Sequence, residues 1–340
     1  MKPKINLFWF RRDLRLHDNA GLYHALKGDR PVLPIFIFDT EILDELEDRK
    51  DQRLVFIYES LQAINKQLAK KDSAIDARYG APVKVFGTLL EDYDVGTVYT
   101  NHDYEPYARE RDASIAALLQ KKGIGFKTYK DQVIFEKSEV VKDDGKPYTV
   151  FTPYSRKWDA TLTGFYQQSY PTTRYLKNLL ACGQKELPAL KSMGFEEAAF
   201  RFPSAKPPEA IIRDYDKTRD VPSIAGTSRM SVHLRFGTVS IRDLLREEGP
   251  LNATYRKELI WREFYQAILW HFPYVQTGSF KKEYDQIRWR NNEKEFDAWC
   301  TGQTGYPIVD AGMRELNETG FMLNRVRMVT ASFLCKHLLV

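Results

Sequence analysis

One stretch without glycine or proline combines side chains suited to binding a flat, polar-edged ligand. Residues 256–270 read RKELIWREFYQAILW, and the absence of a helix breaker predicts one continuous helix. Residues three and four apart share a helix face, so Glu258, Trp261, Arg262 and Tyr265 would form one patch. A large indole ring beside a carboxylate and a guanidinium suits a nucleobase, which offers a ring to stack on and polar edges.

The same helix also carries an apolar stripe, which allows a purely structural interpretation. Ile260, Phe264, Ala267 and Ile268 recur at helical spacing and can pack against a core. Glu258 and Arg262 would then be an ordinary surface ion pair of an amphipathic helix. The helix alone leaves both a ligand site and a packing role open.

Hydroxyl groups that precede a later apolar run form a second candidate site. Thr227 and Ser228, together with backbone N–H groups at a helix start, could bind an anion, and Arg229 adds a guanidinium that suits a phosphate. N-capping by either hydroxyl explains the same pattern. Tyr215 and Arg219, one helical turn apart, could stack on a ring and contact a phosphate, or form a surface pair.

Two further segments could contact a ligand. Arg11, Arg12 and Asp13 lie just past the carboxyl end of the first predicted strand, where open sheets favour ligand sites, although a structural salt-bridge turn fits equally well. Asn324 and Met328 share a predicted helix face, so an amide and a thioether could meet a base; filling of a core is the alternative.

Composition limits the class of protein to which the chain belongs. The 340 residues suffice for about two domains, and 43% hydrophobic and 29% charged residues are typical of a soluble globular protein. The net charge of +5 permits a local nucleic-acid-binding patch without requiring one. Three distant cysteines indicate neither a disulfide framework nor a zinc site, so we expect no metal. No apolar run spans a membrane or resembles a signal peptide, which predicts a cytoplasmic protein.

The periodicity predicts an α/β region followed by an all-helical one. Apolar runs at 5–10, 32–38, 95–100 and 124–129 predict strands, and 74–79 is a weaker strand candidate. The intervening segments predict helices over 19–27, from Asp51 to about Lys71, and over 106–122. Strands that alternate with helices indicate a parallel sheet covered on both faces. Asp143, Asp144 and Gly145 predict a turn, residues 152–210 a connector with short helices, and the rest only helices.

Several motifs together resemble the DNA photolyase/cryptochrome family. Residues 9–19 (WFRRDLRLHDN) are similar to its opening signature, and 226–231, 258–265 and 304–310 resemble later motifs in the family's order. Residues 324–334 (NRVRMVTASFL) are most similar to class I cyclobutane-dimer photolyases. Each motif alone is weak, but together they cover essentially the whole chain.

The resemblance implies the fold and the activity. It implies an α/β, doubly wound parallel-sheet antenna domain (residues 1–131), a connector (132–208) and an all-helical FAD-binding domain (209–340). It also implies light-driven repair of cyclobutane pyrimidine dimers in UV-damaged DNA, by electron transfer from reduced FAD. We expect such a protein to be monomeric and not to bind membranes.

The resemblance also assigns roles to residues at matching positions. Glu258 would stabilise the dimer radical anion through a hydrogen bond, Trp261 would pack on the dimer, and Trp289 would be the outermost tryptophan of the path that re-reduces the flavin. The residues expected to bind FAD are Tyr215, Thr227, Ser228, Arg229, Met230, Ser231, Arg262 and Arg327. The residues expected to bind DNA are Arg219, Glu258, Trp261, Arg262, Tyr265, Asn324, Arg325 and Met328.

The sequence departs from the family pattern in two places. It stops in an apolar helical run at 336–340 (KHLLV), where the family's helix continues, so we expect a truncated member. Members with a folate antenna carry an Asn-Glu pair near Tyr107 and Ala108, which this sequence lacks; a deazaflavin, another second chromophore or none remains open. The competing functions are a cryptochrome-type flavin photoreceptor and an inactive photolyase fragment.

Overall fold

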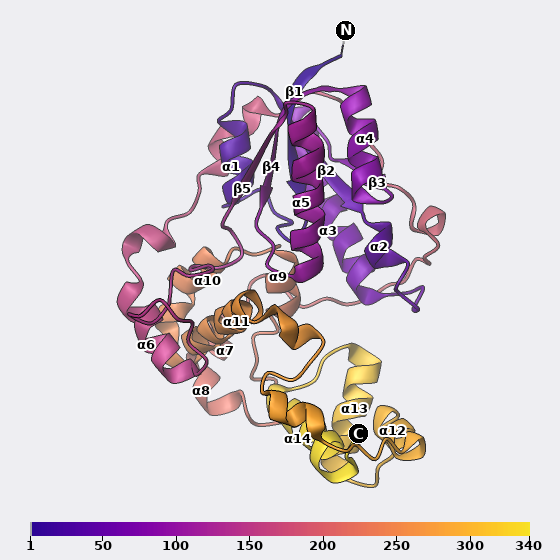
Figure 1. Cartoon of the computed structure of the whole chain (residues 1–340), viewed down its shortest axis with the longest axis vertical. Helices are drawn as coiled ribbons and strands as arrows, with labels where there is room; N and C mark the ends of the chain where they lie inside the picture. The colour runs from indigo at the N-terminus through magenta and orange to yellow at the C-terminus, as the bar shows by residue number, and fades with distance from the viewer. Residues whose placement is uncertain (1) are drawn as a thin grey trace. The chain divides into compact units, whose positions relative to one another are not determined.

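A five-stranded parallel sheet forms the N-terminal part of the computed structural model, which describes residues 2–340 (Figure 1). The strand order is β3-β2-β1-β4-β5, and every neighbouring pair is parallel. The strands are β1 (Lys4–Phe10), β2 (Val32–Phe38), β3 (Asp76–Tyr79), β4 (Asp94–Asn101) and β5 (Gly125–Tyr129). All five predicted strands, including the weaker third one, and the parallel arrangement are therefore confirmed.

Helices cover both faces of this sheet because its strands are apolar on both sides. Phe8 and Phe10 of β1 belong to a core with α1 and α3, whereas Leu7 and Trp9 belong to the opposite core with α4 and α5. The covering helices are α1 (Ala20–Leu26), α2 (Thr40–Leu43), α3 (Gln52–Leu68), α4 (Pro82–Asp92) and α5 (Pro106–Lys121). The predicted helices at 19–27, after Asp51 and at 106–122 are confirmed.

A buried ion network fixes the loop that follows β1. Arg15 lies 2.7 Å from the carboxylate of Asp131, and Arg242 lies 2.8 Å from Asp131 and 3.0 Å from Asp18. All four side chains are nearly inaccessible to solvent. Removal of one partner from such a network leaves an uncompensated buried charge, which typically costs about 3–5 kcal/mol. The network therefore holds the segment after β1 against α10, which lies more than 200 residues later in the sequence.

The remainder of the described chain contains helices and turns. As predicted, Asp143, Asp144 and Gly145 lie in a turn, in which the Gly145 N–H donates to the carbonyl of Lys142. No strand occurs after β5 within residues 2–340. The later helices are α6 (Phe151–Thr161), α7 (Glu209–Arg213), α8 (Tyr215–Thr218), α9 (Ser231–Phe236), α10 (Ile241–Glu247), α11 (Ala253–His271), α12 (Glu293–Cys300), α13 (Pro307–Thr319) and α14 (Asn324–Phe333).

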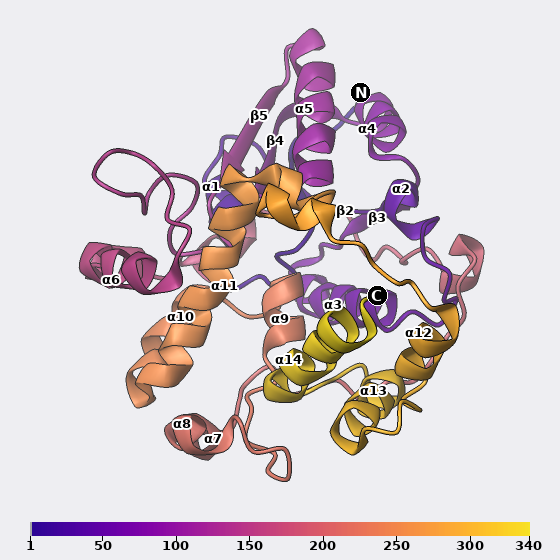
Figure 2. The same cartoon turned by 60° about the horizontal axis from the view of Figure 1, so that its bottom comes forward.

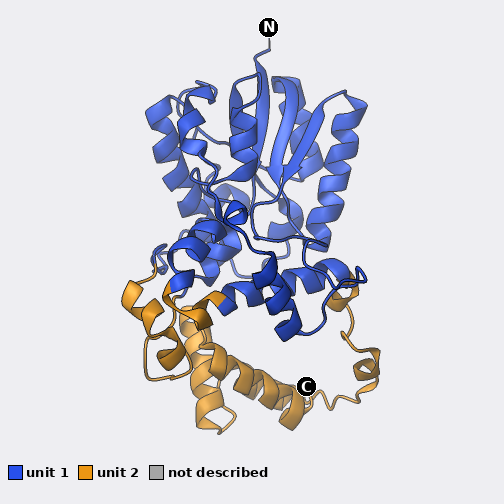
Figure 3. Ribbon diagram, turned by 90° about the vertical axis from the view of Figure 1, so that its left-hand side faces the viewer, with its two compact units in different colours: residues 1–206, 229–250, 257–271 blue, residues 207–228, 251–256, 272–340 orange. Residues whose placement is uncertain are grey.

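The chain divides into two compact units (Figure 3). Unit 1 contains residues 1–206, 229–250 and 257–271, and unit 2 contains residues 207–228, 251–256 and 272–340. Within unit 2, α13 and α14 lie side by side (Figure 2). They pack through Met313 and Val326, and Gly312 lies against Val326. The predicted division at 131 and 208 stays a prediction. Among residues 2–340, no helix is long and apolar enough to cross a membrane.

Candidate flavin and DNA site and a second cavity

Helix α11 presents an aromatic surface and a buried anchor on different sides. As predicted, the segment 256–270 is one continuous helix. The indole of Trp261 stacks on the ring of Tyr265, with centroids 5.5 Å apart, and 62% of Tyr265 is exposed. Glu258, one turn before Trp261, is half-buried. The half-buried Trp261 and the exposed Tyr265 thus form an aromatic surface near Glu258, which is part of the patch predicted for this helix.

Arg262 points toward neighbouring backbone instead of joining this patch. Its guanidinium donates to the carbonyl of Gln132 at 2.7 Å and to that of Leu234 at 3.2 Å. Burial lowers the pKa of Arg262 to about 10. The side chain thereby ties α11 to the start of the connector and to α9. Its predicted contacts with flavin and DNA stay predictions.

The sequence analysis missed Glu263, a buried carboxylate inside the apolar stripe of α11. It accepts hydrogen bonds from the backbone N–H groups of Ile134 (2.7 Å) and Phe135 (2.9 Å) and from the indole N–H of Trp158. Only 2% of the residue is exposed. A signal was present, because Glu263 lies three residues after Ile260 and directly before Phe264, both of which are buried. A charged residue in an apolar stripe indicates a satisfied buried group.

The predicted flavin-binding segment contains residues that belong to each of the two units. Thr227 and Ser228 end a unit 2 segment, and Arg229 begins a unit 1 segment that continues through Met230 and Ser231. Arg229 has a left-handed backbone with φ of +53°. Gly226 could not carry a side chain, because a Cβ would lie 2.5 Å from Thr218. Hydroxyl and guanidinium donors without a carboxylate between 226 and 231 fit the phosphates of FAD chemically.

The remaining predicted residues of unit 2 fall into three places. Arg219 lies over the ring of Tyr215 at 5.5 Å, and Tyr215 packs edge-on against Tyr255. Arg219 and Arg325 both form ion pairs with Asp220, at 3.6 and 2.8 Å. Trp289 is 41% exposed, and its predicted place in the electron path stays a prediction. Helix α14 carries the last three of these residues, Asn324, Arg327 and Met328. Of these, Met328 is 57% exposed.

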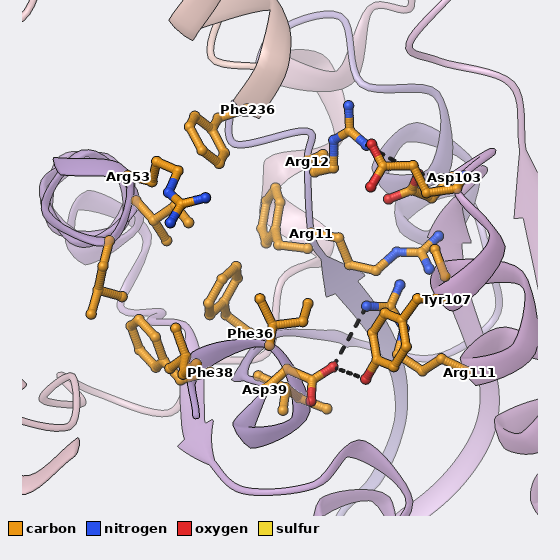
Figure 4. A pocket seen from close by; sticks show the side chains of 18 of the residues that line it. Arg11, Arg12, Phe36, Phe38, Asp39, Arg53, Asp103, Tyr107, Arg111 and Phe236 are labelled. Carbon is orange, nitrogen blue, oxygen red and sulfur yellow. Dashed lines mark hydrogen bonds and ion pairs between the residues drawn. The ribbon is translucent and has the colours of Figure 1, made fainter. Parts of the chain in front are cut away.

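A second site lies at the carboxyl edge of the sheet, beside the strands at which the strand order reverses. It is a cavity of about 210 Å³, whereas one water molecule needs only about 10–15 Å³ on this measure. Phe36, Phe38 and Phe236 contribute aromatic walls (Figure 4). This edge is where open parallel sheets bind ligands. Arg11 and Arg12 both line this cavity, but Arg11 also pairs with Asp112 and Arg12 with Asp103 and Glu105, so the ligand site and the structural salt-bridge turn both stay open for this segment.

Charged and polar groups are concentrated on one side of this cavity. Tyr107 donates a 2.5 Å hydrogen bond to Asp39, and Arg111 lies 3.8 Å from the same carboxylate. Burial and the bond to Asp39 raise the pKa of the Tyr107 hydroxyl. Glu105 lies between Arg12 (2.7 Å) and Arg235. The cavity therefore combines apolar walls with anchored carboxylates and guanidinium groups, which suits a flat ring system with polar edges.

Comparisons with known proteins identify the class of fold. A class III photolyase from Agrobacterium tumefaciens superposes with a TM-score of 0.81, at 29% identity, over 100% of this chain and 74% of that chain. An archaeal photolyase from Sulfolobus tokodaii, solved with two FAD molecules, gives 0.77 at 30% identity over 99% and 76%. A Synechocystis cryptochrome gives 0.81 at 24% identity. The fold is that of photolyases and cryptochromes.

Sequence comparisons give the family. Residues 6–174 match the model of DNA photolyase, and residues 255–340 match that of the FAD binding domain of DNA photolyase. The deoxyribodipyrimidine photo-lyase of a Synechococcus species is 35% identical over 98% of this chain and 74% of its own length. That of Halobacterium salinarum is 34% identical over 99% and 76%. The chain belongs to the DNA photolyase family, which confirms the resemblance, and it spans about three quarters of these relatives.

The buried carboxyl of Glu263 should give the stability of the protein a measurable pH dependence. Burial raises its pKa from an ordinary 4.5 to about 7, so the folded chain holds this proton over a range in which the unfolded chain has lost it. Its contribution to stability therefore falls as the pH rises from about 4.5 to 7 and is constant above that range.

We expect the unfolding free energy of the wild type, relative to Glu263→Gln, to fall by on the order of 2–3 kcal/mol between pH 5 and pH 8. Urea denaturation followed by circular dichroism at several pH values measures this difference. Glu59→Gln, at an exposed position of α3, is the matched control and should give a constant difference. A constant difference for Glu263→Gln as well would contradict the assignment.

Proposed function

We propose that this chain repairs cyclobutane pyrimidine dimers in DNA, with FAD as its light-absorbing cofactor. The observation that carries the proposal is the face of α11, where Trp261 stacks with the exposed Tyr265 one turn from Glu258. Family membership and relatives named deoxyribodipyrimidine photo-lyase support the reaction. A class I enzyme remains a prediction, since one similar solved structure is a class III photolyase.

The substrate would be a dimer that has left the DNA stack. A dimer is poorly paired and stacked, so its extrusion costs less than that of an intact base. Trp261 and Tyr265 offer aromatic surface to the extruded base. Arg219 and Arg325 carry charge suited to phosphates of the damaged strand, and such contacts position a duplex without reading its sequence. Asn324 and Met328 are proposed to line the substrate side.

Bound FAD, in its reduced form, would supply light-driven transfer of one electron that returns after the ring has split. The two carbon–carbon bonds of the cyclobutane ring that join the pyrimidines would break, and the carbon–carbon double bond of each pyrimidine would return, with no net redox change. The carboxyl O–H of Glu258 would donate a hydrogen bond to the dimer, and this donor would stabilise the extra negative charge while the ring opens. Electrostatic stabilisation at the developing charge is commonly the largest protein contribution to a reaction.

The residues proposed to hold FAD offer donors and a ring contact. Thr227, Ser228 and Ser231 carry hydroxyls, and Arg229 carries a guanidinium, all suited to phosphate. Tyr215 is 9% exposed and Met230 is 3% exposed, so they can contribute buried surface to a ring. Arg262 would act through its hold on α9, and Arg327 is proposed to lie near the flavin. Trp289 would be the outer point from which electrons re-reduce the flavin.

We also propose that the cavity beside Asp39 binds a second chromophore. It lies at the sheet edge where ligands bind in this class of fold, and its aromatic walls and paired charges suit a flat conjugated ring. The two FAD molecules of the Sulfolobus tokodaii photolyase make FAD a reasonable probe. Such a chromophore would absorb light and transfer the excitation energy, and the cavity residues would orient it.

Replacement of Glu258 should uncouple binding from repair. We expect Glu258→Ala to lower the number of dimers split per absorbed photon several-fold, because the negative charge on the dimer loses its hydrogen-bond donor. The flavin spectrum and the affinity for DNA should change little. Repair is measured by reversal of dimers in an oligonucleotide under blue light. Glu59→Ala, remote on α3, is the control. If the wild type repairs dimers and Glu258→Ala repairs them equally well, Glu258 does not have this role. If the wild type shows no repair but binds a partner in a light-dependent manner, a photoreceptor function is favoured.

Filling the second cavity should remove one bound chromophore. Ile42 lines the cavity and is 44% exposed, so Ile42→Trp can occupy the space with little disruption of the core. We expect the wild type to bind two equivalents of FAD in a titration, as in the Sulfolobus tokodaii structure, and Ile42→Trp to bind one. Val83→Trp, 46% exposed on α4 outside the cavity, should bind two. Two equivalents in Ile42→Trp would contradict the cavity assignment.

A further inference from the structure

One face of the Trp261 indole is already covered in the protein. The ring of Phe151 stacks on it with centroids 3.6 Å apart and planes only 6° from parallel. Phe151 is the first residue of α6, far from α11 in the sequence. Both rings are only half-buried, and the third ring of the group, Tyr265, is largely exposed. A base that stacks on Trp261 must therefore use the surface that Phe151 leaves open.

The position of Phe151 is fixed by how α6 packs on α11. Phe151, Tyr154 and Trp158 lie at helical spacing on one face of α6. Tyr154 is 2% exposed and packs on Phe264 at 5.1 Å, and the indole of Trp158 is held by the buried Glu263. These two contacts hold α6 against α11 with Phe151 stacked on Trp261. The orientation of Trp261 is thus set by the connector as well as by its own helix.

We propose that Phe151 is a positioning residue for the pyrimidine dimer: it holds the indole of Trp261, and with it the aromatic surface that Trp261 shares with the exposed Tyr265, in one orientation before the extruded base binds. This inference rests on the function proposed above. A side chain fixed before binding loses less conformational freedom on binding, so preorganisation raises affinity without a new contact. Phe151 itself would not touch the dimer. Undamaged DNA, which does not place a base on Trp261, would gain nothing from this preorganisation.

The test compares damaged and undamaged DNA in the full chain reconstituted with FAD. Phe151→Leu keeps an apolar side chain but removes the stacked ring, and Phe151→Tyr restores a ring. We expect Phe151→Leu to weaken binding of a thymine-dimer oligonucleotide about three- to tenfold and to leave binding of the same undamaged sequence unchanged. Phe151→Tyr should bind the dimer like the wild type. Phe165→Leu, 74% exposed in the same connector, is the matched control and should behave like the wild type.

The outcomes separate this inference from the proposed function. A wild type that binds damaged and undamaged DNA equally would overturn the proposed function and this inference with it. A selective wild type whose selectivity survives in Phe151→Leu would overturn the inference alone. Equal loss of both affinities in Phe151→Leu, or failure of Phe151→Tyr to restore dimer binding, would also overturn it, because a purely structural role predicts those results. Acrylamide quenching of tryptophan fluorescence gives a second readout. The contribution of Trp261 is the part of the fluorescence that Trp261→Phe removes. Acrylamide should quench this part more strongly in Phe151→Leu than in the wild type.

Discussion

The site depends on one buried carboxylate. Glu263 accepts two backbone N–H groups from the start of the connector and the indole N–H of Trp158 from α6, and so it holds three separate segments together. A buried carboxylate without such donors would be strongly unfavourable, so the connector start, α6 and α11 stabilise one another. Because Trp158 is held here, Phe151, two turns earlier on α6, meets Trp261. The aromatic face proposed to bind DNA is therefore a consequence of an interaction on the buried side of the same helix.

Helix α9 connects this arrangement to the second cavity. Its Leu234 carbonyl accepts from Arg262 of α11, while Arg235 and Phe236 line the cavity at the sheet edge. Residues 227–231, which lead into α9, carry the hydroxyl and guanidinium groups proposed to bind the flavin phosphates. The proposed sites thus involve one short helix, and Gly237 at its C-terminal end fits against the backbone of Arg12, where a Cβ would overlap. Arg12 belongs to the loop after β1, which the ion pair between Arg15 and Asp131 holds in place.

Much of the fold could be predicted because its signals are local. Each strand is an apolar run, and 256–270 is helical since nothing in it breaks a helix. Helix α4 received no assignment, because Gly87 interrupts its pattern. Only part of the expected substrate patch is present in the structure. Trp261 stacks on Tyr265, whereas Arg262 donates hydrogen bonds to the carbonyls of Gln132 and Leu234. Sequence spacing gives the face of a helix and not its partners. The partners of Glu263, the contact of Phe151 and the Asp39–Tyr107 pair could not be found, since they join residues tens to more than a hundred positions apart.

The central claim is that light drives an electron from the bound, reduced flavin to a dimer held against α11. Its most direct test is the fluorescence lifetime of the reduced FAD in the reconstituted chain, with and without a thymine-dimer oligonucleotide. Electron transfer competes with emission, so the account predicts a shorter lifetime with the dimer and an unchanged lifetime with the same undamaged sequence. A dimer-containing oligonucleotide that is bound, as a mobility shift would establish, but leaves the lifetime unchanged would contradict the account.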